Sequence, residues 1–581
     1  MRSANHAWLP EKLDFSGITA SIDAKLPPDS YRVEGNAVYG GDEAGLLYGK
    51  FAYLRGFQGT SAPAVRNRAL NHWDNMTGDV ERGYAGRSLF FKDGKIDYDP
   101  KRIEGYAALM ASVGINQISL NNVNVTPLSA RLITEDFLPQ LSQLAAIFAK
   151  YYIRLLISVE FSAPQSIGGL NTCDPLDGNV AEWWEKQAAL VYKHIPNLAG
   201  FLVKADSEFR TGPAALGRTQ ADGANVIARA LEPHGGLLYW RCFVYNCQQD
   251  WRDTKTDRPK AAYDHFYPLD GKFDDNVILQ IKNGPTDFQV REPNSPLLTA
   301  LKHTREAIEF QVTQEYTGHQ IDLYALAPQW EEVFATLGDT KFDAVCAVSN
   351  VGSDDSWTGH PLAQANFYAF GRLAWEPALT AKEIIGEWTR QTFDGAAVAP
   401  IEAMLLKSRE VYEKYNAPLG IGWMVNIGHH YGPSVDGYEY MKWGTYHKAN
   451  HTAIGIDRTK SGTGLTVQYP PEVAAVYENP ETCPENLLLF FHRKPFTYRL
   501  KSGKTIIQHI YDTHFEGADE AAEFLKIWES LKGLVAEDIY KNALERFKLQ
   551  AENAREWRDV VNTYFHRLTA IDDEKGRKIY E

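Results

Sequence analysis

The chain has 581 residues and a formal net charge of -14, and 44% of its residues are hydrophobic and 12% aromatic. A chain of this length and composition can bury a large core and should form more than one domain. The acidic balance argues against nucleic acid and against an anionic membrane as main partners, because both attract basic surfaces.

The cysteines and the first residues set two further limits. Five cysteines in an odd count, with no CxxC spacing, predict buried reduced thiols and neither a disulfide framework nor a structural zinc site. The opening MRSANHAWLPEKLDFSG lacks an apolar leader region, and no run of about 18 apolar residues follows. We therefore expect a cytoplasmic protein without a membrane partner.

Residues 1–75 alternate in the manner of strands and then turn helical, as in SGITASIDAKLPPDSYRVEGNAVYGGDEAGLLYGKFAYLR. This pattern predicts a small N-terminal α/β domain.

From about residue 84, short runs rich in β-branched and aromatic residues alternate with amphipathic helical stretches. The predicted strands are 83–91, 114–124, 153–164, 198–208, 236–245, 276–285, 307–316 and 342–352. Eight strands interleaved with helices are typical of a (β/α)8 barrel. A doubly wound open sheet is the alternative, and it is disfavoured because no strand is followed by a GxGxxG turn.

The sequence thus predicts an α/β protein with a central (β/α)8 TIM barrel at 76–395. Beyond it, 396–581 contains long helical runs such as ADEAAEFLKIWESLKGLV, broken by an aromatic segment. This region is predicted to be a mostly α-helical C-terminal domain.

Charged residues gather where the predicted strands end, and in a barrel those ends form one mouth. They are Glu160, Lys204, Glu208, Arg241, Lys282, Asp287 and Glu315. Since an unpaired buried ion is costly, three interpretations are open: structural ion pairs, a metal site, or a site that holds an anionic ligand and performs acid/base chemistry. Lys204 and Glu208 are four residues apart, so on a strand both would point to the same side.

Paired carboxylates are the catalytic groups of glycosidases, where one protonates the leaving oxygen and the other serves the opposite face of the sugar. Aromatic side chains such as Trp423 of IGWMVNIGHHYGP offer flat faces for sugar rings, although core packing is the simpler role for any one of them.

Several stretches resemble the α-glucuronidases of glycoside hydrolase family 67, which remove glucuronic acid or its 4-O-methyl form from xylooligosaccharides. The stretches are ERGYAGRSLFF, FLVKADSE, WRCFVYN, QIKNGPTDFQVREPNSP, QEYTGHQ and WMVNIGHHYGP. The resemblance implies small acidic xylooligosaccharides (aldouronic acids) as substrates and no metal or cofactor. It also implies a homodimer formed by the C-terminal helices, although amphipathic helices can equally pack on their own barrel. The N-terminal domain looks shortened relative to the family.

The resemblance also assigns roles. Glu208 of KADSE matches the general acid, and Asp287 and Glu315 match the two carboxylates that activate water, in a single displacement with inversion. Lys204, Arg241 and Lys282 match basic positions around the glucuronate, and Glu81 of ERGYAG matches a sugar-binding acid. Glu160 and Trp423 join these as candidate substrate-binding residues. As an acid, Glu208 should have a raised pKa, which desolvation favours and Lys204 opposes.

Two other functions fit the same residues. Carboxylates and lysines at strand ends can hold Mg²⁺ in a metal-dependent barrel enzyme of the enolase kind. A degenerate barrel could also bind acidic sugars without cleaving them.

Overall fold

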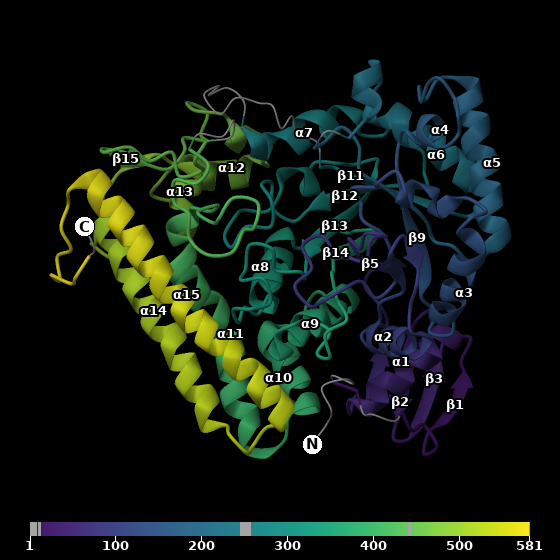
Figure 1. Ribbon diagram of the computed structural model, residues 1–581, viewed down its shortest axis with the longest axis horizontal. Coiled ribbons are helices and arrows are strands. Elements are labelled where there is room, and N and C mark those ends of the chain that lie inside the picture. The colour runs from purple at the N-terminus through teal and green to yellow at the C-terminus, as the bar shows by residue number, and fades with distance from the viewer. Residues whose placement is uncertain (1–7, 10–12, 209, 244–256, 440–443, 580–581) are drawn as a thin grey trace.

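A closed barrel of eight parallel strands forms the centre of the computed structural model, which describes residues 8–9, 13–208, 210–243, 257–439 and 444–579 (Figure 1). In chain order its strands are β5 (Asn67–Asn71), β8 (Gln117–Ser119), β9 (Arg154–Val159), β10 (Gly200–Val203), β11 (Leu237–Arg241), β12 (Val277–Lys282), β13 (Arg305–Gln311) and β14 (Ala344–Val348). β14 pairs with β5 and closes the barrel. The predicted (β/α)8 architecture is confirmed.

The first strand of the barrel is not the one that the sequence predicted. It is β5, which precedes residue 75, whereas the predicted strand 83–91 is loop up to the two-residue strand β6 (Phe91–Lys92), paired with β7 (Lys95–Ile96). β5 has the sequence NRALN, and its polar residues do not show the apolar pattern by which the other strands were predicted. Arg68 is fully buried there because its guanidinium donates to the carbonyl oxygens of Gly114 at 2.5 Å and Val65 at 2.7 Å.

The inner face of the barrel follows the two-residue period of each strand. Leu202, Tyr239 and Ile278 belong to the apolar cluster that fills the interior. Two residues beyond Leu202 and Tyr239, and four beyond Ile278, the same faces carry Lys204, Arg241 and Lys282. The sequence therefore places three cations inward at the C-terminal mouth.

Helices surround the barrel, and several have clear sequence signals at their N-termini. They are α2 (Pro100–Ser112), α3 (Leu138–Ala149), α4 (Ala163–Ser166), α5 (Gly178–His194), α6 (Gln220–Leu231), α7 (Ala261–Phe266), α8 (Ala327–Leu337) and α9 (Gln364–Trp375). Asp99 caps α2 ahead of a proline, and Thr219 and Asp222 form a capping box on α6.

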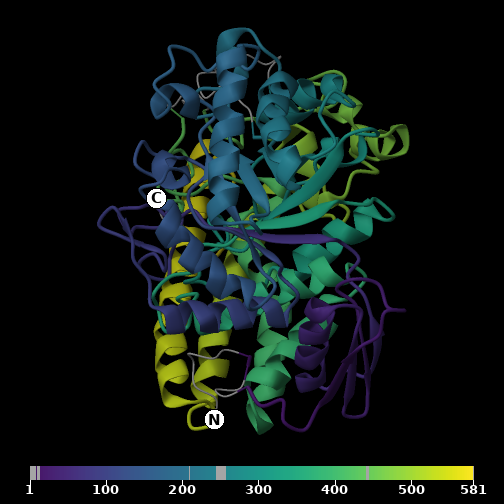
Figure 2. The ribbon, with the colours of Figure 1, turned by 90° about the vertical axis from the view of Figure 1, so that its right-hand side faces the viewer.

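A small N-terminal unit packs against the barrel on the side opposite the mouth (Figure 2). Its sheet has the order β1-β3-β2-β4, with β1 (Thr19–Ile22), β2 (Tyr31–Glu34), β3 (Ala37–Gly40) and β4 (Gly59–Ser61), and α1 (Glu43–Leu54) packs on it. Tyr31 and Tyr48 contact the Trp375 ring, and Asp29 pairs with Arg68 at 3.1 Å.

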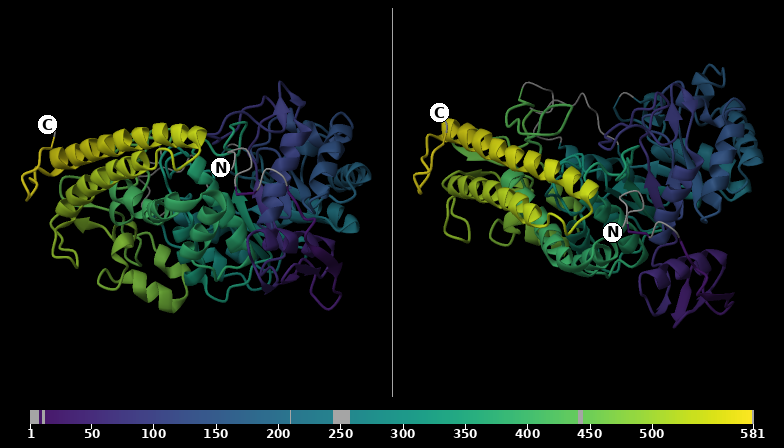
Figure 3. Two further views of the ribbon diagram at one scale, coloured as in Figure 1. Left: turned by 90° about the horizontal axis from the view of Figure 1, so that it is seen from below. Right: turned by 60° about the horizontal axis from the view of Figure 1, so that its bottom comes forward.

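The C-terminal region consists mainly of α10 (Ala381–Thr392), α11 (Val398–Asn416), α14 (Ile506–Ser530) and α15 (Glu537–Thr569). Figures 1 and 3 show α14 and α15 side by side along α11. The segment between α11 and α14 is irregular, with α12 (Pro471–Glu478), α13 (Leu488–Phe491), and β15 (Ala453–Ile454) paired with β16 (Lys494–Pro495). Among the described residues, no helix is both long and apolar enough to span a bilayer.

Replacement of Gly200 tests how closely β10 and β11 approach each other. Its φ is +143°, and a Cβ added there would lie 1.8 Å from the carbonyl oxygen of Leu237. We expect Gly200→Ala to lower the free energy of unfolding by about 3 kcal/mol, because backbone must move. Gly105→Ala is the matched control, since nothing lies within 4 Å of its added Cβ and alanine favours a helix. Equal stability of the two variants in denaturant titrations would contradict this packing.

Candidate active site

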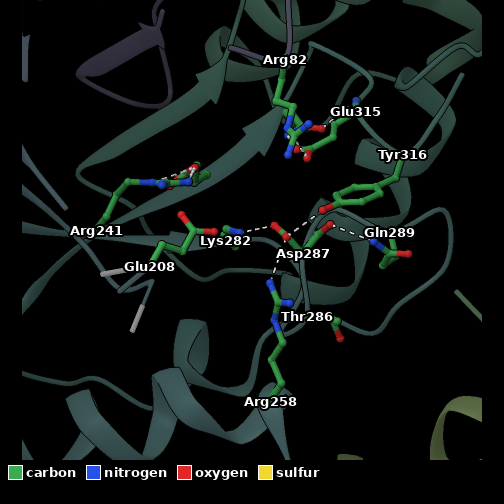
Figure 4. Close-up of polar contacts among 12 residues, drawn as sticks. Arg82, Glu208, Arg241, Arg258, Lys282, Thr286, Asp287, Gln289, Glu315 and Tyr316 are labelled. Carbon is green, nitrogen blue, oxygen red and sulfur yellow. Dashed lines mark hydrogen bonds and ion pairs between the residues drawn. The ribbon is translucent and has the colours of Figure 1, made fainter. Parts of the chain in front are cut away.

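A cavity of about 260 Å³ opens at the C-terminal mouth of the barrel. Eight of the nine predicted site residues line it: Glu81, Lys204, Glu208, Arg241, Lys282, Asp287, Glu315 and Trp423. Figure 4 shows Glu208, Asp287 and Glu315 around a shared space, with Lys282 beside Asp287. Residues spread over more than half of the chain therefore converge on one site.

Asp287 lies in the loop after β12 and is held by three donors. The Lys282 ammonium contacts one carboxylate oxygen, while the Arg258 guanidinium and the Tyr316 hydroxyl each donate to the other at 3.0 Å. Burial acts to raise the pKa of Asp287, but Lys282 and Arg258 outweigh it and hold the pKa well below its usual value. Asp287 is therefore ionised throughout the neutral range.

Glu315 follows β13 and is also buried among donors. The Arg82 Nε lies 2.8 Å from one carboxylate oxygen, and His430 Nδ1 lies 2.9 Å from the same atom. Gln311 donates to the second oxygen at 3.0 Å and accepts from the Glu315 backbone at 3.0 Å. The carboxylate is fixed in orientation from three separate segments.

Glu208 is the most open of the three, with 39% of its side chain exposed. It lies beyond the end of β10, in a turn with φ of +49°, so the expectation that it shares a strand with Lys204 is wrong. The turn nevertheless brings Glu208 onto the Lys204 ammonium, which also donates to Asn124 at 2.8 Å.

The pKa of Glu208 also differs from the expectation. Burial acts to raise it, but the charge of Lys204, its hydrogen bond to the carboxylate and the charge of Lys282 together outweigh burial, and the net shift is downward, not upward. To act as a general acid, Glu208 therefore needs a change at the site that weakens its ion pair with Lys204. Burial in turn lowers the pKa of Lys204, which the Glu208 carboxylate opposes.

Arg241 is 1% exposed and forms a two-point ion pair with Glu309 of β13, at 2.9 Å and 2.5 Å. Its Nη1 has no hydrogen-bond partner among the described residues, although the side chain borders the cavity. A buried guanidinium nitrogen without a partner is costly. Arg241 therefore keeps one donor that its ion pair with Glu309 does not use.

A second cavity, of about 630 Å³, lies beside the first and shares three lining residues with it: Glu81, Asn124 and Glu208. Glu81 accepts from Asn122 at 2.6 Å and from Asn124 at 3.2 Å. Glu208 consequently stands at the junction of a small, cation-lined cavity and a larger one whose lining includes Asn75, Asn122 and Thr126.

The two remaining candidates differ in position. Trp423 lines the first cavity, but its ring stacks on Tyr446 at 4.2 Å and lies 4.4 Å from the Arg258 guanidinium, so it supports a cation as well as the wall. Glu160 is absent from the lining of both cavities, and its carboxylate accepts from the Ser166 hydroxyl at 2.9 Å.

Sequence reasoning did not select Arg82, Arg258, Tyr316 or His430, which hold the carboxylates. Three of them had a local signal, because Arg82 and Tyr316 adjoin the selected Glu81 and Glu315, and His430 lies in the quoted aromatic stretch. Arg258 had none, since it lies 29 residues from Asp287 in a segment without a strand end.

Comparison with known families agrees with this geometry. The model described as glycosyl hydrolase family 67 middle domain matches residues 51–342, and the model described as glycosyl hydrolase family 67 C-terminus matches residues 358–578. The chain belongs to glycoside hydrolase family 67. The expected family is thereby confirmed.

Two relatives of this family 67 member are named as α-glucuronidases. A probable α-glucuronidase A of Aspergillus clavatus is 45% identical over 93% of this chain and 68% of its own length. The α-glucuronidase A of Aspergillus tubingensis is 43% identical over 95% of this chain and 69% of its own. A solved family GH115 4-O-methyl-α-glucuronidase with specificity for decorated arabinogalactans is 12% identical, with a TM-score of 0.48, over 93% of this chain and 64% of its own.

Lys282 lowers the pKa of Asp287, and replacement of Lys282 tests this effect. We expect Lys282→Met to move the acidic limb of the kcat/KM profile to higher pH, because the carboxylate loses the strongest contact that lowers its pKa. Lys302→Met is the control, since Lys302 donates to the Thr299 carbonyl away from the cavity. An unchanged acidic limb in Lys282→Met would remove Asp287 from the groups that govern it.

Proposed function

We propose that this family 67 enzyme is an inverting α-glucuronidase that releases α-1,2-linked glucuronate, with or without a 4-O-methyl group, from the end of small xylooligosaccharides. The main observation that supports this proposal is the position of Glu208 at the junction of the two cavities. One group there can protonate an oxygen that joins a sugar in the first cavity to a sugar in the second.

The first cavity suits the acid sugar. Lys204, Lys282 and Arg241 border a space of about 260 Å³, which matches one monosaccharide better than an oligosaccharide. Charge-assisted hydrogen bonds from such cations are the usual means of holding a carboxylate. The larger cavity, which contains Asn75, Asn122 and Thr126, would take the neutral xylose units.

The acid step follows from the charge balance around Glu208. Lys204 holds the Glu208 pKa low, and a glucuronate carboxylate at Lys204 would offset that field and raise the pKa. Glu208 would then donate its proton to the leaving xylose oxygen as the bond to the anomeric carbon breaks. The xylooligosaccharide leaves with that proton.

The water step falls to Asp287 and Glu315. Both are held as acceptors by cations, which suits a carboxylate that takes a proton from an attacking water. Water bonds to the anomeric carbon on the face opposite the leaving oxygen, so β-glucuronate is the expected product. The Tyr316 hydroxyl fixes Asp287 at 3.0 Å and so limits its motion during the step.

The charge pattern favours a hydrolase over the two alternatives. A divalent cation of the enolase kind would have to displace Lys282 and Arg258 from Asp287, or Arg82 from Glu315. A barrel that only binds acidic sugars would have no need for three carboxylates held in such fixed orientations. Release of glucuronate from aldotriouronic acid, unaffected by EDTA, is the result that supports the hydrolase.

Glu208→Gln tests the acid role. We expect a loss of about 10²- to 10⁴-fold in kcat on aldotriouronic acid, with affinity retained, because the leaving xylose needs a proton. On 4-nitrophenyl α-glucuronide, whose leaving group needs none, the loss should be much smaller.

Glu160→Gln is the matched control, because Glu160 borders neither cavity. It should keep kcat and KM on both substrates within about twofold. Equal losses on both substrates in Glu208→Gln would assign Glu208 a role other than proton donor.

A further inference from the structure

We propose that Asp322 is a positioning residue for Glu315, which ties the C-terminal helix α15 to the loop that carries this carboxylate. The inference rests on the proposed role of Glu315 in water activation. Asp322 belongs to the same loop after β13 as Glu315, yet it borders neither cavity. It therefore has to act through other residues.

Asp322 is a buried carboxylate, 1% exposed, with three donors from three separate segments. Tyr415 of α11 and Asn553 of α15 donate to one oxygen at 2.8 Å and 2.7 Å, and Tyr431 donates to the other at 2.8 Å. Burial raises the pKa of Asp322 to about 6, although the three hydrogen bonds oppose this. A carboxyl group this costly to bury calls for a specific use.

The bond to Tyr431 leads directly to the site. The preceding residue, His430, has its Nδ1 2.9 Å from the Glu315 carboxylate and its Nε2 3.2 Å from the Tyr438 hydroxyl. His430 has a φ of +64°, so its placement depends on the contacts of its neighbours. Asp322 thus fixes the segment that delivers His430 to Glu315.

The loop that carries Glu315 and Asp322 needs such an anchor. Gln314, His319 and Gln320 have φ values of +65°, +55° and +55°, a region that non-glycine residues rarely occupy. Conformations of this kind persist only where the surroundings determine them, and they concentrate at functional sites.

Helix α15 anchors this loop at a second point. The Gln550 side chain accepts from the backbone N–H of Leu323 at 3.1 Å and donates to the Leu323 carbonyl at 3.4 Å. Asn553, which bonds Asp322, is nearly one turn further along the same helix. Gln550 and Asn553 both secure the loop to α15, and the contact of Asn553 is made directly to Asp322, whose other oxygen accepts from Tyr431.

Two tyrosines on one carboxylate give a matched test. Tyr431→Phe breaks the branch that leads to His430, whereas Tyr415→Phe breaks a branch that leads to α11 and, through Gln550, back to α15. We expect Tyr431→Phe to lower kcat on aldotriouronic acid by about 10-fold or more with little change in KM, because misplacement of a catalytic group slows the chemical step. Tyr415→Phe should lower Tm by a similar amount and keep kcat within about twofold.

A cycle with Asp322→Asn separates positioning from stability. Adding Tyr431→Phe to Asp322→Asn should cause no further loss of kcat, since both act through one path. Equal kcat values for the two tyrosine variants, or additive losses in the cycle, would overturn the proposal.

A readout without turnover keeps this test apart from the proposed function. The ¹⁵N resonance of His430 Nδ1, assigned with His430→Gln, should move in Tyr431→Phe and stay in place in Tyr415→Phe. If wild-type protein releases no glucuronate, the proposed function fails, and the resonance still decides whether Asp322 positions His430. An unmoved resonance in Tyr431→Phe would overturn the positioning role.

Discussion

The pairing of each of the three proposed catalytic carboxylates with a cation is the constraint on which this site depends. An ion in the barrel mouth is costly to desolvate unless a partner offsets the cost, and here Lys204, Lys282 and Arg82 hold Glu208, Asp287 and Glu315. Lys204 and Lys282 also hold the pKa values of Glu208 and Asp287 below their usual values. The cations of these pairs also allow the mouth to hold an anionic ligand. The carboxylate of an incoming ligand can take the place of a protein carboxylate beside one of these cations.

These ion pairs in turn require that segments far apart in the sequence keep fixed positions relative to one another. Arg82 comes from the loop after β5, Arg258 from the segment after β11, and His430 from the stretch that follows α11. The barrel fixes the strand ends, while Tyr415 of α11 and Asn553 of α15 hold the loop after β13. In this family 67 member, the C-terminal helical region therefore contributes to the site as well as to the fold.

Strand periodicity explains what the sequence could predict. Lys204, Arg241 and Lys282 continue the inward rows of apolar residues, so their convergence followed from the barrel alone. β5 was missed because its buried Arg68 is satisfied by carbonyl oxygens, which no local pattern reveals. The downward pKa shift of Glu208 was missed because the balance between burial and one ammonium depends on a turn that ends the strand early.

The stereochemistry of the released sugar tests the account most directly. Proton NMR of the enzyme acting on aldotriouronic acid, followed over the first minutes, distinguishes the anomers before they equilibrate. The account predicts that β-glucuronate appears first, because water attacks the anomeric carbon on the face opposite the oxygen that Glu208 protonates. Appearance of the α-anomer first would mean that one of the carboxylates is a nucleophile, and it would contradict the roles given to Asp287 and Glu315.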